Sequence, residues 1–109
     1  MAQPIFVTAE LKMRSDLPRS EVISAIEAFC LAMQSEAGCL QAVATYDQTN
    51  PQRVILWELY EDRTAIEAHF SMPHTQAFIA TEVTELVHVF ETQPLTADLA
   101  ILNSAEFSL

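Results

Sequence analysis

The sequence is poor in basic residues and in long apolar runs. Of its 109 residues only 5 are Lys or Arg, against 15 Asp or Glu, and the formal net charge is −10. Nucleic acid and anionic membrane surfaces are bound through clustered cations, so both are disfavoured as partners. No apolar run approaches the roughly 20 residues of a membrane span. Residues 1–14 lack the pattern of a signal peptide, so we expect a cytoplasmic protein.

Cysteine and glycine are equally scarce. Cys30 and Cys39 form no CxxC pair, so they predict buried, reduced, structural thiols rather than a redox or metal motif. Gly38 is the only glycine, which excludes a glycine-rich loop for a phosphate-bearing cofactor. Its place just after an apolar-periodic segment predicts a left-handed residue that ends a helix.

What the sequence does have is clear periodicity. Alternating apolar residues predict strands over 5–14, 39–47 and 83–92, and a run that is apolar on both faces predicts a strand over 53–61. In the strand over 39–47 the apolar face should carry Leu40, Ala42, Ala44 and Tyr46. Apolar residues at helical spacing predict a helix over about 18–36, with Asp16 as its cap. A second helix should begin near Asp62 or Thr64, where Thr64–Glu67 fits a capping box, and should break at Pro73.

The resulting order, β-α-β-β-α-β, predicts an α+β, ferredoxin-like sandwich in a single domain over 1–109. Its core should span about 5–94, and residues 95–109 should form a C-terminal arm. Both helices would cover one face of the sheet and leave the other bare. The third strand is apolar on both faces, with Leu56 on one and Trp57 on the other. Because such a strand is covered on both sides, we expect a homodimer formed through the face that bears Trp57.

Several motifs resemble those of the antibiotic biosynthesis monooxygenase family, and most closely those of its quinol monooxygenase members. The motifs are Trp57–Asp62, Ala65, Glu67–His69, Pro73-His74 and Ala77-Phe78, with Glu36-x-Gly38-Cys39 upstream. The resemblance implies a dimeric α/β barrel and a cofactor-free oxygenase with a pocket between helices and sheet. Haem-degrading relatives carry Trp at the position of Tyr60 and Asn on the first strand. This chain has neither, so haem degradation is disfavoured.

Oxygenation without a cofactor needs a base that makes the substrate electron-rich, a donor that holds the anion, and a dry pocket. We expect His69, His74 and Tyr60 to be the catalytic residues. The predicted pocket residues are Glu58, Leu56, Phe70 and Phe78. For Glu58 a structural pair with an Arg or a backbone donor is the alternative to orienting a histidine. His88 is expected to be buried or to face the dimer partner.

No metal site is expected, because His69 and His74 are five residues apart with a proline between them. The first hypothesis, which the family resemblance implies, is a cofactor-independent monooxygenase that uses molecular oxygen on a small phenolic or quinol-like molecule. An isomerase or a binding module for a small metabolite on the same scaffold is the alternative, and a fold with a vestigial pocket is a third. An apolar, aromatic pocket with one or two histidines would favour the oxygenase.

Overall fold

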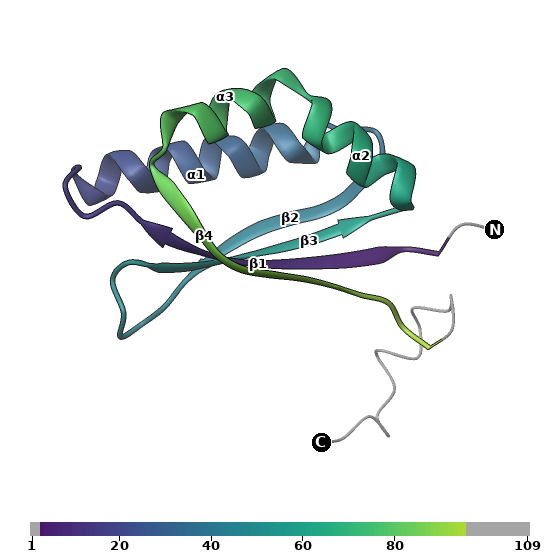
Figure 1. Ribbon diagram of the computed structural model, residues 1–109, viewed down its shortest axis with the longest axis horizontal. Helices are drawn as coiled ribbons and strands as arrows, with labels where there is room; N and C mark the ends of the chain where they lie inside the picture. The colour runs from purple at the N-terminus through teal and green to yellow at the C-terminus, as the bar shows by residue number, and fades with distance from the viewer. Residues whose placement is uncertain (1–2, 96–109) are drawn as a thin grey trace.

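The structure of the protein is a computed structural model that describes residues 3–95. Within them the chain forms β1 (Ile5–Met13), α1 (Arg19–Gln34), β2 (Cys39–Tyr46), β3 (Arg53–Tyr60), α2 (Arg63–Ser71), α3 (Pro73–Thr81) and β4 (Thr84–Thr92). The strands make one antiparallel sheet in the order β2-β3-β1-β4. The helices lie together over one face of that sheet (Figure 1). The predicted ferredoxin-like α+β fold is confirmed, and the predicted arm lies outside the described residues apart from Leu95.

The core forms between α1 and the helix-facing side of the sheet. Every second residue of β1 is buried, as the alternation predicts, and α1 buries one apolar stripe. These residues are Ile5, Val7, Ala9, Leu11 and Met13 on β1, and Val22, Ile26, Phe29, Cys30 and Met33 on α1. Each large apolar side chain that is fully buried stabilises the fold by about 1.5–3 kcal/mol. This packing fixes α1 against the helix-facing side of the sheet.

The opposite face of the sheet carries exposed apolar side chains and is not covered by the helices (Figure 1). Trp57 stays 45% exposed there, while Leu56 and Tyr60 on the other face of β3 are buried. Thr8 pairs with Trp57 on one side and with Phe90 on the other, so these residues share the open face. Trp57 Nε1 donates to Thr45 Oγ1 at 2.8 Å, which anchors the indole to β2.

Local details correct three sequence predictions. A register shift in β2 between Cys39 and Gln41 leaves Leu40 exposed, although alternation predicts that it is buried. Asp16 pairs with Arg14 and does not cap α1. The capping box at Thr64 is wrong as well, because Asp62 is the residue that caps α2 and accepts from Ala65 N at 2.8 Å.

Gly38 serves a purpose other than the one its position predicts. No described glycine has a positive φ, and the left-handed residue of the described chain is Glu82, at the end of α3. An ideal Cβ placed on Gly38 would lie 2.3 Å from Cβ of Ala65 on α2. The backbone of Glu61 also donates to the Gly38 carbonyl at 2.9 Å. Glycine is therefore required by the close approach of α2 to the junction between α1 and β2.

Replacing Gly38 with Ala should destabilise the protein by about 1–3 kcal/mol, because the added methyl overlaps the Ala65 side chain. Urea denaturation measures the difference. The double variant Gly38→Ala/Ala65→Gly removes the overlapping methyl and should recover part of the loss. Equal stabilities of Gly38→Ala and the double variant would contradict the close-approach explanation.

Candidate acid–base site

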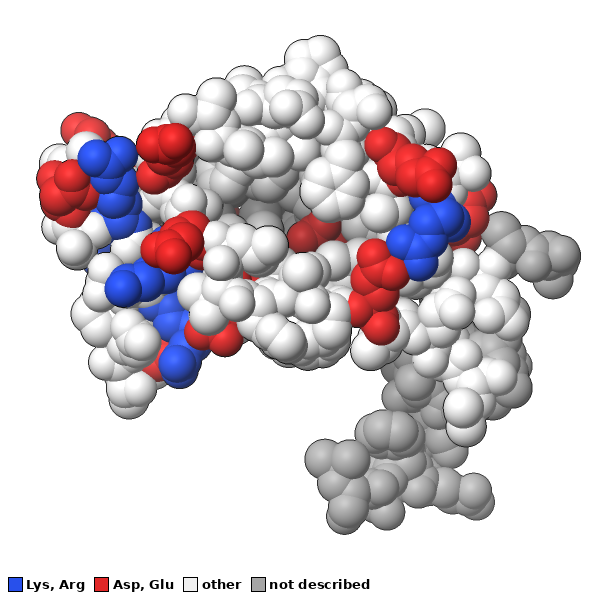
Figure 2. Space-filling model, in the orientation of Figure 1, with Lys and Arg blue, Asp and Glu red and all other residues white. Residues whose placement is uncertain are grey.

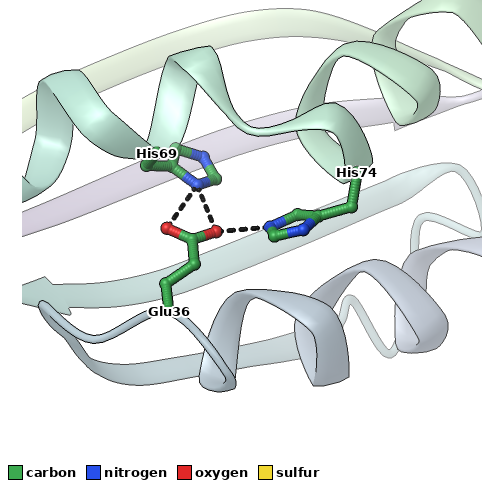
Figure 3. A group of neighbouring side chains, drawn as sticks. All are labelled: Glu36, His69 and His74. Atoms are coloured by element: carbon green, nitrogen blue, oxygen red, sulfur yellow. Dashed lines mark hydrogen bonds and ion pairs between the residues drawn. The ribbon is translucent and has the colours of Figure 1, made fainter.

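A buried carboxylate holds two imidazoles where the three helical segments meet. Glu36 comes from the junction that follows α1, His69 from α2 and His74 from the first turn of α3 (Figure 3). His69 Nδ1 lies 2.9 Å from Glu36 Oε2 and 3.2 Å from Glu36 Oε1. His74 Nε2 lies 2.6 Å from Glu36 Oε2. The side chains of Glu36 and His69 are only 5% and 6% exposed, whereas that of His74 is 28% exposed. The cluster therefore runs from the interior towards the surface.

With Glu36 ionised and both rings neutral, the hydrogen bonds assign where each ring carries its proton. An ionised carboxylate only accepts hydrogen bonds, so each neutral ring donates from the nitrogen that faces Glu36. His69 then carries its proton on Nδ1 and His74 on Nε2. The second nitrogen of each ring points away from the carboxylate and holds a lone pair (Figure 3). A carboxylate behind an imidazole also stabilises the imidazolium that forms when that lone pair takes up a proton.

Aromatic rings enclose the two histidines. The ring of His69 lies 5.5 Å from Tyr60, 5.9 Å from Phe29 and 5.2 Å from Phe70, measured between centroids. Phe29 stacks on Phe78 with centroids 4.3 Å apart. Of the predicted pocket residues, Leu56 is buried in the core, Phe78 is half-buried, and Phe70 is 56% exposed.

Glu58 is buried below the helices and satisfied by a phenol. Tyr60 donates its hydroxyl to Glu58 Oε1 at 2.5 Å. Among residues 3–95 no Arg, backbone donor or histidine forms a hydrogen bond with this carboxyl group, although His69 lies near enough to affect its pKa. Burial raises the pKa of Glu58 and nearby Glu36 raises it further, while the Tyr60 hydroxyl and His69 oppose this. Burial and the Glu58 charge raise the pKa of Tyr60 as well, which keeps the phenol protonated.

A hollow opens between the helical layer and the sheet. Figure 2 shows it, with acidic atoms at its bottom. Glu36 and Glu58 are the acidic side chains that are buried among residues 3–95. Val89 on β4 pairs with Ala9, which faces the helices, yet Val89 is 45% exposed because no helix covers β4.

A separate groove of about 320 Å³ lies between α1 and β2, and neither His69 nor His74 lines it.

The remaining reactive side chains lie outside this cluster. His88 is exposed on β4, so the prediction of burial is wrong within the single chain; it pairs with Glu10 on the open face. Cys30 and Cys39 are free and buried, as predicted. Burial raises the pKa of each thiol to about 11, which leaves both protonated and unreactive near neutral pH.

Glu36 is the site residue that sequence reasoning missed. It is 33 residues from His69 and 38 from His74, so no local spacing connects them. The available signal was an acidic residue two positions before the only glycine, within a motif that resembles the family's helix-to-strand junction.

The protein has a ferredoxin-like α+β fold whose helices bury a carboxylate between two imidazoles, which form a candidate acid–base site. The chain belongs to the antibiotic biosynthesis monooxygenase family, whose model matches residues 4–81. The Bacillus subtilis protein YjcS is 28% identical over 81 residues, which cover 74% of this chain and 77% of YjcS. None of the helices within residues 3–95 is long and apolar enough to cross a membrane.

Solved structures extend the comparison. Rv0793 from Mycobacterium tuberculosis is 26% identical and superposes with a TM-score of 0.74, covering 86% of this chain and 97% of that one. SnoaB from Streptomyces nogalater, a cofactor-independent oxygenase solved as a point mutant, superposes with a TM-score of 0.75 over 87% of this chain and 96% of its own. At 7% identity, that similarity shows a shared fold.

Burial of Glu58 predicts a specific pH dependence of stability. Its pKa is raised in the folded protein, so above about pH 4.5 the unfolded chain loses a proton that the folded chain retains. Stability contributed by this group is therefore complete below that pH and is lost as pH rises through the folded pKa. The Glu58→Gln variant has no ionisable group at this position. Its free energy of unfolding should therefore increase relative to that of the wild type as pH rises.

Urea denaturation between pH 4 and 8 measures the effect. Glu85→Gln, at an exposed glutamate of β4, is the matched control and should keep the wild-type dependence. Parallel curves for wild type and Glu58→Gln would show that Glu58 ionises as easily in the folded protein as in the unfolded chain.

Proposed function

We propose that the protein is a cofactor-independent monooxygenase that oxidises a small phenolic or quinol-like molecule with molecular oxygen. The observation that supports this most directly is the buried Glu36 carboxylate, which orients two imidazoles with their lone pairs directed away from it. Such an arrangement suits a base that removes a phenolic proton. Membership of the family and the shared fold with a cofactor-independent oxygenase agree with the proposal.

The chemistry would begin with proton transfer. His69 Nε2 takes the proton of a substrate hydroxyl, and Glu36 stabilises the imidazolium. The phenolate passes one electron to oxygen, and the two radicals combine into a hydroperoxide on the ring. Loss of water then leaves one oxygen atom on the product, so that a hydroquinone and O₂ yield a hydroxyquinone and water. Tyr60 and His74 are the predicted donors to the anion. Tyr60 donates its hydroxyl to Glu58 and His74 donates from Nε2 to Glu36, so either would have to turn from its carboxylate to the substrate.

The imidazolium on His69 would be balanced where it forms. His69 is buried, Glu36 contacts both rings, and His74 reaches the surface. Because Nε2 of His74 already carries a proton, Glu36 would stabilise the charge on His69 and would pass no proton on to His74. Phe29, Phe70 and Phe78 would keep water from the reacting anion and present aromatic surface to a planar substrate.

The proposed cellular setting is the cytoplasm. The two cysteines are free and buried, which fits a reducing compartment.

We also expect two chains to associate through the open face of the sheet. Trp57 and Phe90 lie on that face and are each nearly half exposed. Placing this face against its copy would cover the apolar side chains and complete a barrel. The stable association of two chains generally buries at least about 1,000 Å².

Oxygen uptake with a panel of hydroquinones, measured with metal and flavin removed, tests the function. His69→Ala should lower turnover by about 10²–10⁴-fold, because it removes the base. Glu36→Gln should lower kcat by about 10²-fold or more with little change in KM, and should alter the pH profile, because it disturbs the tautomers. The exposed histidine supplies a control, His88→Gln, which should retain wild-type turnover.

Two results would count against this function: no oxygen uptake with any hydroquinone, or full activity in His69→Ala. Binding of a hydroquinone without oxygen uptake would favour the binding-module alternative.

Trp57→Glu should weaken self-association, because it places a charge on the apolar face. Sedimentation or light scattering over a dilution series measures the monomer–dimer equilibrium. Leu31→Glu, at an exposed leucine of α1, introduces the same charge elsewhere and should leave association unchanged. A wild-type protein that is monomeric at micromolar concentration would contradict the expected dimer.

A further inference from the structure

Glu36, His69 and His74 also form a set of metal ligands. Their nearest nitrogen and oxygen atoms all lie within 4.8 Å of one another. Two imidazole nitrogens and one carboxylate are a protein ligand set that binds Zn²⁺, with a water molecule in the fourth position. Tetrahedral bonds of about 2.0–2.2 Å separate neighbouring ligand atoms by roughly 3.3 Å. The contacts of 2.6 and 2.9 Å would therefore widen by about 0.7 and 0.4 Å. The ligand nitrogens of the two rings, which lie within 4.8 Å of each other, would move to the same spacing.

The charges around the cluster favour a cation. No ion pair among residues 3–95 brings a Lys or Arg to Glu36. Arg14, Arg53 and Arg63 instead pair with acidic residues near the surface. Glu58 adds a second buried carboxyl group beside His69. The ligand types also select the ion, because Mg²⁺ and Ca²⁺ prefer oxygen ligands whereas imidazole nitrogen suits zinc-type transition metals.

We infer that the Glu36–His69–His74 cluster binds a zinc-type divalent ion, and that an ion bound there inhibits the enzyme. The second part rests on the function proposed above. The ion needs the lone pairs of His69 Nδ1 and His74 Nε2, so each ring must move its proton to its other nitrogen. The protons would then lie on His69 Nε2 and His74 Nδ1. His69 Nε2 is the atom with which the proposed base takes up the substrate proton. Metal binding and proton abstraction thus require opposite tautomers of the same rings and exclude each other.

Calorimetric titration of tag-free, chelator-treated protein with zinc chloride tests the site. We expect one zinc ion per chain with a dissociation constant in the micromolar range or below. Loss of a group that merely supports a ligand typically costs 10–100-fold in affinity, so loss of a ligand in His74→Ala should cost about 100-fold or more. His74 is part-exposed, which makes this variant suitable; circular dichroism verifies its fold, and Glu36→Gln provides a second test. The matched control, His88→Gln, should bind zinc as wild type does.

Cobalt chloride reports the geometry independently. Replacement of zinc by Co²⁺ should give the intense visible absorption of a four-coordinate site in wild type and His88→Gln, and not in His74→Ala. Absence of one-to-one zinc binding by wild type, or equal affinities in His74→Ala and His88→Gln, would overturn the site.

Oxygen uptake in the presence of zinc separates this inference from the proposed function. With an active enzyme, one equivalent of zinc should abolish turnover and a chelator should restore it. Zinc binding that leaves turnover unchanged, or increases it, would overturn the inhibition. Zinc binding by a protein with no oxygenase activity would leave the site established and would refute the proposed function alone.

Discussion

A buried carboxylate without a cationic partner is the constraint around which the helical layer is organised. Isolation of such a charge from water costs several kcal/mol unless hydrogen bonds satisfy it. The chain has only five basic residues, and those that pair with acids do so at the surface. Glu36 is satisfied by two imidazoles instead, and these come from two further helices. Stabilisation of one charge therefore holds α2 and α3 against the end of α1.

The contact between Gly38 and Ala65 makes this arrangement possible. Ala65 and His69 are four residues apart and so lie on one face of α2, one turn from each other. Because Gly38 contacts Ala65, the segment just before Gly38, which contains Glu36, lies against the next turn of α2, where His69 is found. A larger residue at either contact position would move the carboxylate away from the imidazole. The lone glycine thus acts on the acid–base centre through geometry, although it touches neither histidine.

The fold could be predicted from the sequence because its pattern is local. Alternation in β1 and the apolar stripe of α1 each follow from residues within one element, and both are confirmed. The centre could be predicted only in part. His69 and Tyr60 were selected by a motif, but the partner of the histidines depends on which junction packs against α2. The bulge at Leu40 was missed for a related reason, since several registers are compatible with the local sequence. The sequence likewise left Asp62 and Thr64 open as the start of α2, and the structure selects Asp62 as the cap.

The order of the strands has a consequence for synthesis of the chain. β1 occupies an interior position between β3 and β4, so the first of the described strands to be synthesised pairs with the last of them. At ~5–20 residues per second, β1 and β3 wait several seconds for β4, with an unpaired backbone edge and apolar faces exposed. Pairing of distant segments is also slow in itself, because the loop must close before any contact stabilises it. Completion of the sheet is therefore the step at which a nascent chain is most vulnerable to pairing with a neighbour.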